Sequence, residues 1–508
     1  MEFNLDDIRR CTQLLEAIIA DRALLASTPS EDQVALLRAA GLAANPDRTS
    51  KTRLTKAVQR MRKRQTQDRD KVTRAQTEIR VVRREAVFTA PSERPPCLPP
   101  PTARLLEKPR HCYVCKTEFR QLHTFYDAMC WDCAEFNYAK RFHSAPLHGR
   151  VALVTGARVK IGFQAALLML RAGAEVIATT RFPNDAAERY AREPDFNEWS
   201  GRLQIHGLDL RHAPSVELFA KHLEVTRDRL DVILNNAAQT VRRPPGFYAH
   251  LLSGELRPVS QVDPRAQALL ADHLRCVERL APNRRLHATT QSATLDTTWR
   301  SADPALGIHA SAALSLLPYA MEQEPYSPAL FPQGKLDADL QQVDLRRVNS
   351  WRLTLSEVDT AEMLEVHLVN AVAPFILCSK LKPLMLRNRS EPGHIVNVSA
   401  MEGSFSRGTK TDKHPHTNMA KAALNMLTLT SAPDYAKSGI YMNAVDTGWV
   451  TDEDPAIHAQ RKVNELDFQP PLDIVDGAAR ICDPVFMSVR TGEVSFGKFF
   501  KDYRPTAW

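Results

Sequence analysis

Four of the nine cysteines stand in two Cys-x-x-Cys pairs, and this spacing is suited to metal binding. The pairs are Cys112 with Cys115 and Cys130 with Cys133, with 14 residues between them. Each pair can place two thiolates on one tetrahedral cation, and four thiolates leave no coordination position open for catalysis. The spacing therefore predicts a structural Zn²⁺ site. His123 is an alternative ligand, and a redox dithiol at either pair is the less favoured function.

The flanks of these pairs indicate what the metal module does. The second pair opens a predicted helix, CAEFNYAKRF, and the arrangement resembles a treble-clef zinc finger. Such a finger binds nucleic acid, binds protein or staples a fold. Because aromatic residues surround the pairs, we expect the module to pack against the next domain; they are Phe119, Phe125, Tyr126, Trp131, Phe136 and Tyr138.

A second chemical signature is a glycine turn between a strand and a helix. The apolar run 151–155 predicts a short buried strand, TGARVKIG follows over 155–162, and an apolar-rich helix comes next. Such a turn lets the backbone approach a pyrophosphate, and the next helix offers free N–H groups and a partial positive charge. The strand before and the helix after supply the required context. The segment therefore predicts nucleotide binding.

Over 148–240 and 360–508 the sequence resembles the short-chain dehydrogenases/reductases. The family's TGxxxGxG turn aligns with Thr155, Gly156 and Gly162. Further motifs of the family align in order, including Asp209-Leu210 and the sequence NNAA that begins at Asn235. The resemblance implies an α/β Rossmann-type doubly wound parallel sheet and a nicotinamide cofactor. The implied cofactor contacts are Thr155, Gly156, Arg158, Lys160, Ile161, Gly162, Arg181, Asp209, Leu210, Asn236, Ala237, Lys421 and Gly448.

The end of the second predicted strand indicates which cofactor is used. The strand EVIATTRF ends in Thr180-Arg181, where an acidic residue would bind the ribose hydroxyls of NAD. An arginine can pair instead with the 2′-phosphate of NADP. Arg158 and Lys160, which replaces the middle glycine of the turn, add positive charge nearby. We therefore expect NADP(H), with NAD(H) as the alternative.

The family's catalytic tyrosine is missing. Ser399 and Asn370 align with the family's serine and asparagine, and Lys421 aligns with the lysine of its Tyr-x-x-x-Lys pair. Thr417 stands four residues before Lys421, and no tyrosine lies between Ser399 and Lys421. A phenol has an ordinary pKa near 10, and a threonine hydroxyl is far too weak an acid to replace it. We therefore expect a rebuilt or silenced centre.

Two residues are candidates for the proton donor that replaces the missing tyrosine. His416 precedes Thr417, and because histidine titrates near neutral pH it is the best substitute donor by chemistry. Tyr248 is a less favoured source of a phenol from elsewhere in the sequence.

The next family motif also departs from the pattern. The Pro-Gly after the sixth strand is replaced by Asp446-Thr447-Gly448. Thr451 comes one position early for the threonine that contacts the cofactor's carboxamide, and Asp452 takes its place. Polar residues crowd this region, and a solvated loop is the simplest interpretation.

The elements around these motifs suggest four regions. Helical spacing predicts helices over 1–24, from Ser30 to near Asn45-Pro46, and from Thr49 or Ser50 to about Val87. We expect 1–88 to form a helical hairpin or short coiled coil. A proline-rich linker follows at 89–107, then the zinc module at 108–145. The Rossmann domain occupies 146–508, with an irregular insertion at about 241–345.

Positive charge is concentrated in one segment. The whole chain carries +8, yet Lys51 to Arg84 holds 13 Lys and Arg against 3 Asp and Glu, a net +10 that leaves about −2 elsewhere. A basic helix attracts phosphate backbones. However, such a run is usually a solvated helix face, and no base-reading pattern is evident. A nucleic-acid partner is thus conceivable through 51–84 but not favoured.

Composition limits the remaining options. With 508 residues and 44% hydrophobic content, the chain can bury at least one large core. We find no run of about 18 apolar residues, and the polar start MEFNLDDIRRCTQ is not typical of a signal peptide. We expect no membrane partner. The cysteine usage favours a reducing compartment, and hence the cytoplasm.

Three functions compete. The first is an NADP(H)-dependent oxidoreductase with altered proton delivery, expected to be a homo-oligomer acting on an unknown small molecule. The second is a catalytically silenced NADP(H)-binding sensor or scaffold that acts through the helical arm and the zinc module. The third is a nucleic-acid-binding protein that uses the basic helix and the finger.

Overall fold

The computed structural model describes residues 4–85, 87, 88, 90, 104–280, 303–319, 326–387 and 391–508. These residues form two compact units, Met1–Val72 and Thr73–Trp508, which are considered separately. Most of the predicted proline-rich linker lies outside the described residues.

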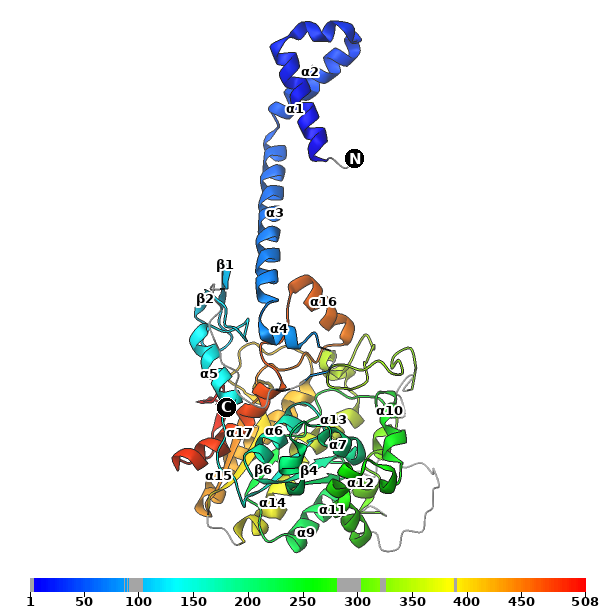
Figure 1. Cartoon of the computed structure of the whole chain (residues 1–508), viewed down its shortest axis with the longest axis vertical. Helices are drawn as coiled ribbons and strands as arrows, with labels where there is room; N and C mark the ends of the chain where they lie inside the picture. Colours follow the sequence, from blue (N-terminus) through cyan, green and yellow to red (C-terminus); the bar gives the residue numbers. More distant parts are fainter. Residues whose placement is uncertain are drawn as a thin grey trace. The chain divides into compact units, whose positions relative to one another are not determined.

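The first unit is helical, as the spacing predicts. It contains α1 (Leu5–Ala20), a 3-10 turn (Arg22–Ser27), α2 (Ser30–Ala44) and most of α3 (Arg48–Arg74), which Figure 1 shows as one long helix. Asn4 caps α1 through a capping box. Among the described residues of this unit, Ile18 is the one buried apolar side chain. The unit therefore has almost no hydrophobic core of its own.

The third helix ends at Arg74, well before the predicted end at Val87. A short helix, α4 (Glu78–Val82), follows the break. The backbone N–H of Glu78 donates to the Thr124 carbonyl (3.0 Å), and the N–H of Ile79 donates to the Phe125 carbonyl (3.1 Å). Because these N–H groups bond the cysteine module instead, the helix cannot continue through this point.

The cysteine module begins slightly earlier than predicted, because β1 starts at Leu105, within the last three residues of the expected linker. It consists of an antiparallel pair, β1 (Leu105–His111) and β2 (Glu118–Gln121), followed by α5 (Trp131–Arg141). Cys130 is the N-cap of α5, so the second cysteine pair opens a helix as the sequence indicates.

The core of the second unit is an eight-stranded sheet in the order β10-β9-β8-β7-β6-β3-β4-β5. It is parallel except for the pair β9 and β10. The strand order reverses between β3 and β6, so the crevice at their carboxyl ends is where such sheets bind ligands. The strands are β3 (Val151–Thr155), β4 (Glu175–Thr180), β5 (Leu203–Gly207), β6 (Val232–Asn235), β7 (Gly393–Ser399), β8 (Ile440–Asp446), β9 (Phe499–Lys501) and β10 (Arg504–Thr506).

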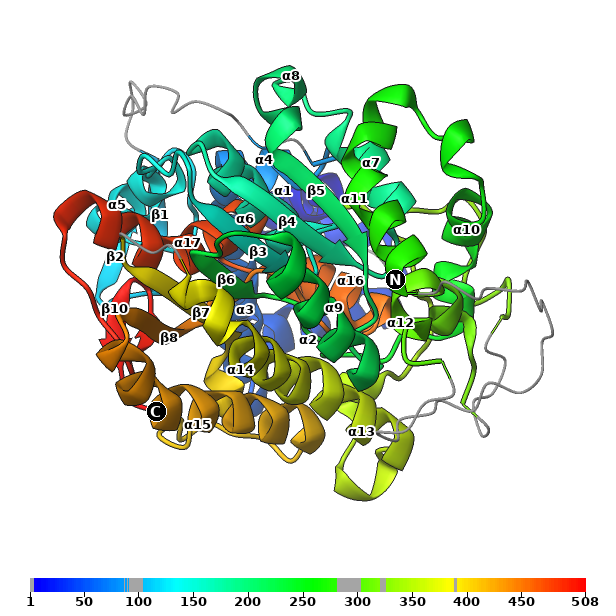
Figure 2. The ribbon, with the colours of Figure 1, turned by 90° about the horizontal axis from the view of Figure 1, so that it is seen from below.

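Helices cover both faces of this sheet (Figure 2). One face packs α6 (Lys160–Arg171) and α17 (Ile474–Thr491). The other packs α9 (Ala213–Thr226), α14 (Ala373–Leu386) and α15 (Pro415–Lys437). The remaining helices of the domain outside the insertion are α7 (Pro183–Tyr190), α8 (Phe196–Trp199), α13 (Thr360–His367) and α16 (Ala456–Leu466).

The insertion is more helical than its proline content predicts. It contains α10 (Pro245–Glu255), α11 (Pro264–Leu280) and α12 (Leu306–His309). Helix α11 packs along β5, and α10 packs on α7. Because β5 is the edge strand, the insertion covers an edge that would otherwise expose unpaired backbone groups.

One helical run is long and apolar enough, by length and composition alone, to cross a membrane. It is Thr360–Leu386, and 56% of its most apolar window is buried inside the fold. Its last part, α14, packs against α9 on the sheet. These contacts are those of a core helix.

Candidate nucleotide site and active centre

The turn after β3 has the tight backbone packing that a dinucleotide loop requires. Gly156 has φ +67°, and a β-carbon there would lie 2.9 Å from the Cα of Ala237. A β-carbon on Gly162 would lie 2.3 Å from the Gly156 carbonyl oxygen and 2.4 Å from the side-chain nitrogen of Asn236. That amide of Asn236 donates to the Thr155 carbonyl (2.9 Å). The turn and the end of β6 therefore leave no room for side chains at the two glycines.

Lys160 and Ile161 have different surroundings within the same turn. Lys160 has φ +55°, a left-handed conformation that costs a non-glycine residue roughly 1 kcal/mol. Glu453 is half-buried, and the desolvation that would raise its pKa is outweighed by Lys160 and Arg243, which hold the pKa below the ordinary value. Ile161 packs on α17, where a β-carbon on Gly477 would lie 2.8 Å from its Cδ1 atom. Lys160 thus adds positive charge that acts on Glu453, and Ile161 packs the turn against α17.

The two arginines expected at the 2′-phosphate differ in their partners. Arg158 donates to the Asp185 carboxylate (2.7 Å), so its charge is compensated. Arg181, just after β4, donates to the Tyr248 hydroxyl (2.8 Å) and to the Ser315 hydroxyl (3.1 Å), both from the insertion. No carboxylate among the described residues pairs with Arg181. Its guanidinium is therefore the better of the two for an incoming phosphate.

Tyr248 lies at the wrong end of the crevice to replace the missing phenol. Burial raises its pKa, but Arg181, Arg243 and Arg242 outweigh burial and leave the pKa below the ordinary value. Its hydroxyl is bound at the end of β4, whereas Ser399 ends β7, three strands away in the sheet. At about 4.8 Å per strand the separation is about 14 Å. Tyr248 is therefore excluded as the proton donor at Ser399 in this conformation.

Asp209 follows β5 as the family motif predicts, but its carboxylate is already bound. Arg211 donates to it from Nε (3.0 Å) and Nη2 (2.6 Å), and both side chains are buried. The backbone N–H of Asp209 donates to the carbonyl of Gly307, in the insertion (2.7 Å). Arg211 also donates to Glu365 (3.0 Å), and Leu210 is buried beside it. The adenine end of the crevice is therefore occupied by internal contacts.

Ser399 and Lys421 are brought together at the end of β7. The Ser399 hydroxyl donates to Asn425 (2.5 Å), and the Lys421 ammonium donates to the Val398 carbonyl (2.8 Å). Both side chains are buried. Burial lowers the pKa of Lys421 to about 8, with Glu402 opposing the shift. The lysine can thus give up a proton close to neutral pH.

Asn370 and Thr417 both hold the segment that follows β6. Asn370 lies in a π-helical turn, Leu368–Val372, between α13 and α14. Its amide donates to the Gln239 carbonyl (2.8 Å) and accepts from the Gln239 N–H (3.1 Å). The Thr417 hydroxyl donates to the Thr240 carbonyl (3.5 Å), at the limit of a hydrogen bond. This segment therefore lies across the predicted centre.

His416 does not fit the role of a substitute proton donor. Its ring is buried, and burial lowers its pKa to about 4, with His414 and His367 adding to the effect. Neither ring nitrogen makes a hydrogen bond with the described residues, and the Glu362 carboxylate lies 3.8 Å away. At neutral pH the imidazole is uncharged. The expectation from the unperturbed pKa is wrong because burial disfavours the imidazolium.

The Asp446-Thr447-Gly448 segment is held from three sides. The Asp446 carboxylate accepts from the Gly448 N–H (3.1 Å) and from Lys501 (3.2 Å), and Asp446 pairs in register with Ser399. The Trp449 N–H donates to the hydroxyl of Tyr113, which lies between the first two cysteines (3.0 Å). The cysteine module thus contacts the predicted cofactor edge directly.

The two residues that displace the family's threonine bind within their own loop. Asp452 forms an ion pair with Lys462 of α16 (2.8 Å), and the Thr451 hydroxyl donates to Glu453 (2.7 Å). The polar side chains of this loop therefore make specific contacts, whereas the sequence alone favours a solvated loop.

The four cysteines predicted to bind a metal lie together. Their sulfur atoms are all within 4.8 Å of one another, and those of Cys115 and Cys130 are 3.6 Å apart. Zinc–sulfur bonds of about 2.3 Å in a tetrahedron place neighbouring sulfurs about 3.8 Å apart, so the set fits one Zn²⁺ ion. His123 is not a ligand in this arrangement. Its Nδ1 accepts from the Phe125 N–H (3.1 Å), and its Nε2 lies 3.3 Å from Glu135.

A buried polar network joins the cysteine module to the Rossmann domain. Arg141 of α5 contacts Asp473 (2.6 Å) and Asp476 (3.0 Å) at the start of α17. The Tyr126 hydroxyl also donates to Asp476. Arg480 donates to Asn137 of α5 (2.7 Å). The module therefore packs against the next domain, as its aromatic flanks predict.

Three residues of the site match no motif of the sequence: Asn425, Arg211 and Tyr113. Asn425 follows Lys421 by four residues, so helical spacing alone could have placed it on the same face. Arg211 follows Asp209 by two residues, which is a usable but weak signal. Tyr113 carries no signal, because its partner, Trp449, is remote in the sequence.

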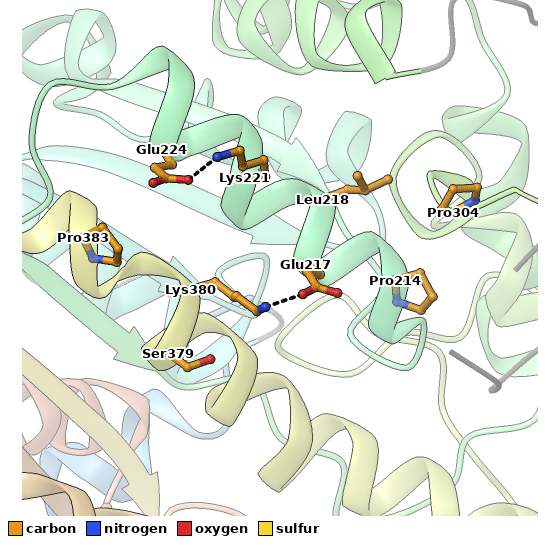
Figure 3. Close-up of a pocket in the computed structure, with 9 residues that line it drawn as sticks. All are labelled: Pro214, Glu217, Leu218, Lys221, Glu224, Pro304, Ser379, Lys380 and Pro383. Carbon is orange, nitrogen blue, oxygen red and sulfur yellow. Dashed lines mark hydrogen bonds and ion pairs between the residues drawn. The ribbon is translucent and has the colours of Figure 1, made fainter. Parts of the chain in front are cut away.

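A separate groove lies between α9 and α14 (Figure 3). Its volume is about 580 Å³, and no predicted site residue lines it. Lys380 pairs with Glu217 (2.5 Å) and Lys221 pairs with Glu224 (2.8 Å). Because its charges are balanced by these pairs, the groove offers no marked ligand chemistry.

Two family profiles match the domain that contains this site. Residues 150–251 match the short chain dehydrogenase family, and residues 348–468 match the enoyl-(acyl carrier protein) reductase family. The interval between them coincides with most of the insertion. These segments therefore form a domain of the short-chain dehydrogenase/reductase family, an oxidoreductase family.

Similar proteins include a viral one. Uncharacterized protein R665 of Acanthamoeba polyphaga mimivirus is 28% identical over 414 residues, 78% of this chain and 74% of that protein. Mouse retinol dehydrogenase 14 is 35% identical over 102 residues, 18% of this chain and 30% of that enzyme. The NADPH-bound carbonyl reductase from chicken fatty liver is 17% identical, with a TM-score of 0.40 over 71% of this chain and 100% of that one.

Proposed function

We propose that residues 146–508 bind NADP(H) and reduce a carbonyl group, or oxidise the corresponding alcohol, with Lys421 in place of the usual tyrosine as the proton donor. The observation that carries the proposal is the turn after β3, where Gly156 and Gly162 leave no room for a β-carbon. Such packing serves a pyrophosphate and has no evident purpose in a merely structural turn.

The residues of the crevice fit this cofactor at its phosphates. The turn 155–162 and the N-terminus of α6 would hold the pyrophosphate. The Arg181 guanidinium, which donates to the Tyr248 phenol and the Ser315 hydroxyl, would exchange these bonds for the 2′-phosphate. At the adenine end, the Asp209 carboxylate already accepts hydrogen bonds from Arg211. One of these bonds must break before Asp209 can bind adenine. Otherwise the base must bind without a hydrogen bond to that carboxylate. When bound, the cofactor supplies or accepts the hydride.

The protein's own residues would manage the proton. Ser399, released from Asn425, would donate a hydrogen bond to the substrate carbonyl oxygen. The Lys421 Nζ would then give its proton to that oxygen, because burial has brought its pKa to about 8. Thr417 is smaller than the tyrosine that the family carries at this position, so it would obstruct the path from Lys421 to the substrate less than a phenol ring. The segment after β6, held by Asn370, would exclude water.

Replacing Lys421 should test this role. Lys421→Met is expected to lower the rate of NADPH oxidation on a panel of small aldehydes and ketones by at least about 100-fold, the usual contribution of a general acid. In the unaltered protein the rate should fall as the pH rises above about 8, since deprotonated lysine has no proton to give. Lys437→Met, on the exposed end of the same helix, is the control. An unchanged rate in Lys421→Met, or no loss of rate above about pH 8, would refute the role.

A second candidate is a silenced cofactor-binding scaffold. It is favoured by the closure of the centre, where Ser399, Asn370, Thr417 and Lys421 are all buried and bound internally. Fluorescence titration with NADPH should then show binding with no turnover. A Thr417→Tyr variant that gains carbonyl reduction, where the unaltered protein has none, would establish this candidate and reject the first.

We also propose that the four-cysteine site holds one structural Zn²⁺ ion. Metal analysis of the purified, reduced protein is expected to find about one zinc per chain. Cys133→Ser should lose the metal and melt at a lower temperature, because metal binding contributes directly to folding. Cys11→Ser, an exposed cysteine of α1, is the matched control. A protein without zinc that melts unchanged would overturn the assignment.

We propose self-association through the outer face of α14 and α15. Five apolar side chains are exposed on these helices: Phe375, Leu386, Met419, Met426 and Leu429. An exposed apolar cluster of this kind marks an interaction surface. We further propose a reducing compartment such as the cytoplasm, since none of the eight described cysteines forms a disulfide with another described residue.

A further inference from the structure

The long helix α3 carries its charge on one side. At 3.6 residues per turn, its apolar residues Leu54, Val58, Met61 and Val72 fall within an arc of about 60°. Seven Lys and Arg fall within a separate arc of about 100°, centred roughly 140° round the helix. Arg74, the last of them, pairs with Asp467 (2.7 Å), which leaves six. These six, called the basic face, are Arg53, Lys56, Arg60, Lys63, Arg64 and Lys71.

The charges of the basic face are uncompensated. All six side chains are exposed. None of them forms an ion pair with any residue that the structure describes. The two acidic residues of the helix, Asp68 and Asp70, project outside the arc, and Asp70 is buried. A solvated helix of ordinary type intersperses both signs of charge at i, i+4 spacing, and this face does not.

The arrangement argues against pairing with a second copy of the same helix. Val58 and Val72 would take the a positions of a coiled coil, and Leu54 and Met61 the d positions. Arg64 would then occupy a g position facing Arg69 of the other copy at e, where like charges repel. A polyanion removes that repulsion, whereas another basic helix adds to it.

The apolar side argues against a membrane surface. Helices that lie on membranes carry a broad apolar face rich in Trp, Phe and Leu. In α3 the stripe is narrow and is interrupted by Gln65 and Asp68, between Met61 and Val72.

A nucleic-acid duplex matches the dimensions and the charge. A 27-residue helix is about 40 Å long and about 10–12 Å wide. The major groove of B-form DNA is about 12 Å wide and admits a helix, whereas that of A-form RNA is too narrow. Phosphates recur at about 1.7 Å of helix axis, so six cations can each meet one.

We propose that the basic face of α3 binds the phosphate backbone of double-stranded DNA without regard to sequence. This binding is independent of the nucleotide site, because it uses no residue of the Rossmann domain.

The test is fluorescence anisotropy of a short labelled DNA duplex with the full-length protein. Six phosphate contacts predict that log K falls with log salt with a slope of about −5. Neutralising four residues of the basic face should reduce that slope to about −2 and weaken binding at about 50 mM salt by at least tenfold. The variant is Lys56→Gln/Arg60→Gln/Lys63→Gln/Arg64→Gln, with circular dichroism to confirm that the helix remains.

A matched variant removes the same charge elsewhere. It is Lys335→Gln/Lys437→Gln/Arg490→Gln/Lys498→Gln, four exposed residues outside α3, and it should bind DNA as the unaltered protein does. An equal loss in both variants would mean that net charge alone attracts DNA and would overturn the proposal. So would absence of DNA binding, tighter binding to duplex RNA, or tighter binding to vesicles of anionic phospholipid.

Discussion

Replacing Arg141 by methionine is expected to lower the free energy of unfolding by about 3–5 kcal/mol, the usual cost of removing one partner from a buried ion pair. Its guanidinium is 1% exposed and lies against the carboxylates of Asp473 and Asp476. Without it, two buried carboxylates face each other at the start of α17. Thermal and urea denaturation would measure the loss.

The pH dependence gives a second readout. Burial raises the pKa of Asp476, whereas Arg141 outweighs burial at Asp473 and holds that pKa below its ordinary value. Asp473 therefore stabilises the fold above its ordinary pKa and loses this effect as the pH falls through its folded value. Without Arg141 both carboxyls should bind protons more readily. The destabilisation should then be smaller near pH 5 than near pH 8.

Lys140→Met is the matched control for this experiment. Lys140 is the neighbouring residue and pairs with Asp483 (2.6 Å) at 13% exposure. It should cost about 1 kcal/mol or less, because a partly exposed pair is screened by solvent. Equal losses in the two variants would mean that the buried network is not what joins the module to α17.

Replacing Gly162 by valine is expected to abolish NADPH binding. The β-carbon would lie 2.3 Å from the Gly156 carbonyl oxygen and 2.4 Å from the Asn236 amide, so the turn must open. Fluorescence titration should show affinity lowered by at least about 100-fold, equivalent to about 2.7 kcal/mol. Gly201→Ala is the control, since a β-carbon there has nothing within 4 Å.

A second, milder variant tests the cofactor site even if the Gly162 variant does not fold. Arg181→Gln leaves the turn intact and removes the cation expected at the 2′-phosphate. It should weaken NADPH by about 10-fold or more, the usual value of a charge-assisted hydrogen bond, and leave NADH nearly unaffected. Equal effects on both cofactors would place Arg181 outside the phosphate site.

Motifs whose contacts are local were predictable. The cysteine pairs, the glycine turn and the breaks between the arm helices depend on spacing within a few residues, and the structure places them close to where the sequence does. The end of α3 at Arg74 was missed, because the N–H groups of Glu78 and Ile79 bond residues some 46 positions later.

The hydrogen-bond partners of the site residues could not be predicted from the sequence. Ser399, Asn370 and Lys421 were identified from the resemblance, but nothing in their spacing reveals the partners that they bind. Asp209 was expected to meet adenine and instead holds Arg211.

By itself the sequence determined the family of the domain, the grouping of four cysteines and the helical arm, because these depend on local spacing and motif order. Only the tertiary structure decided which of the predicted residues can act. It buried His416 and Lys421, and so brought their pKa values to about 4 and about 8. The physical reason is that a proton affinity depends on burial and on charges from remote segments. For these two residues the charges include Glu402, after β7, and His367, at the end of α13, which no local pattern positions beside them.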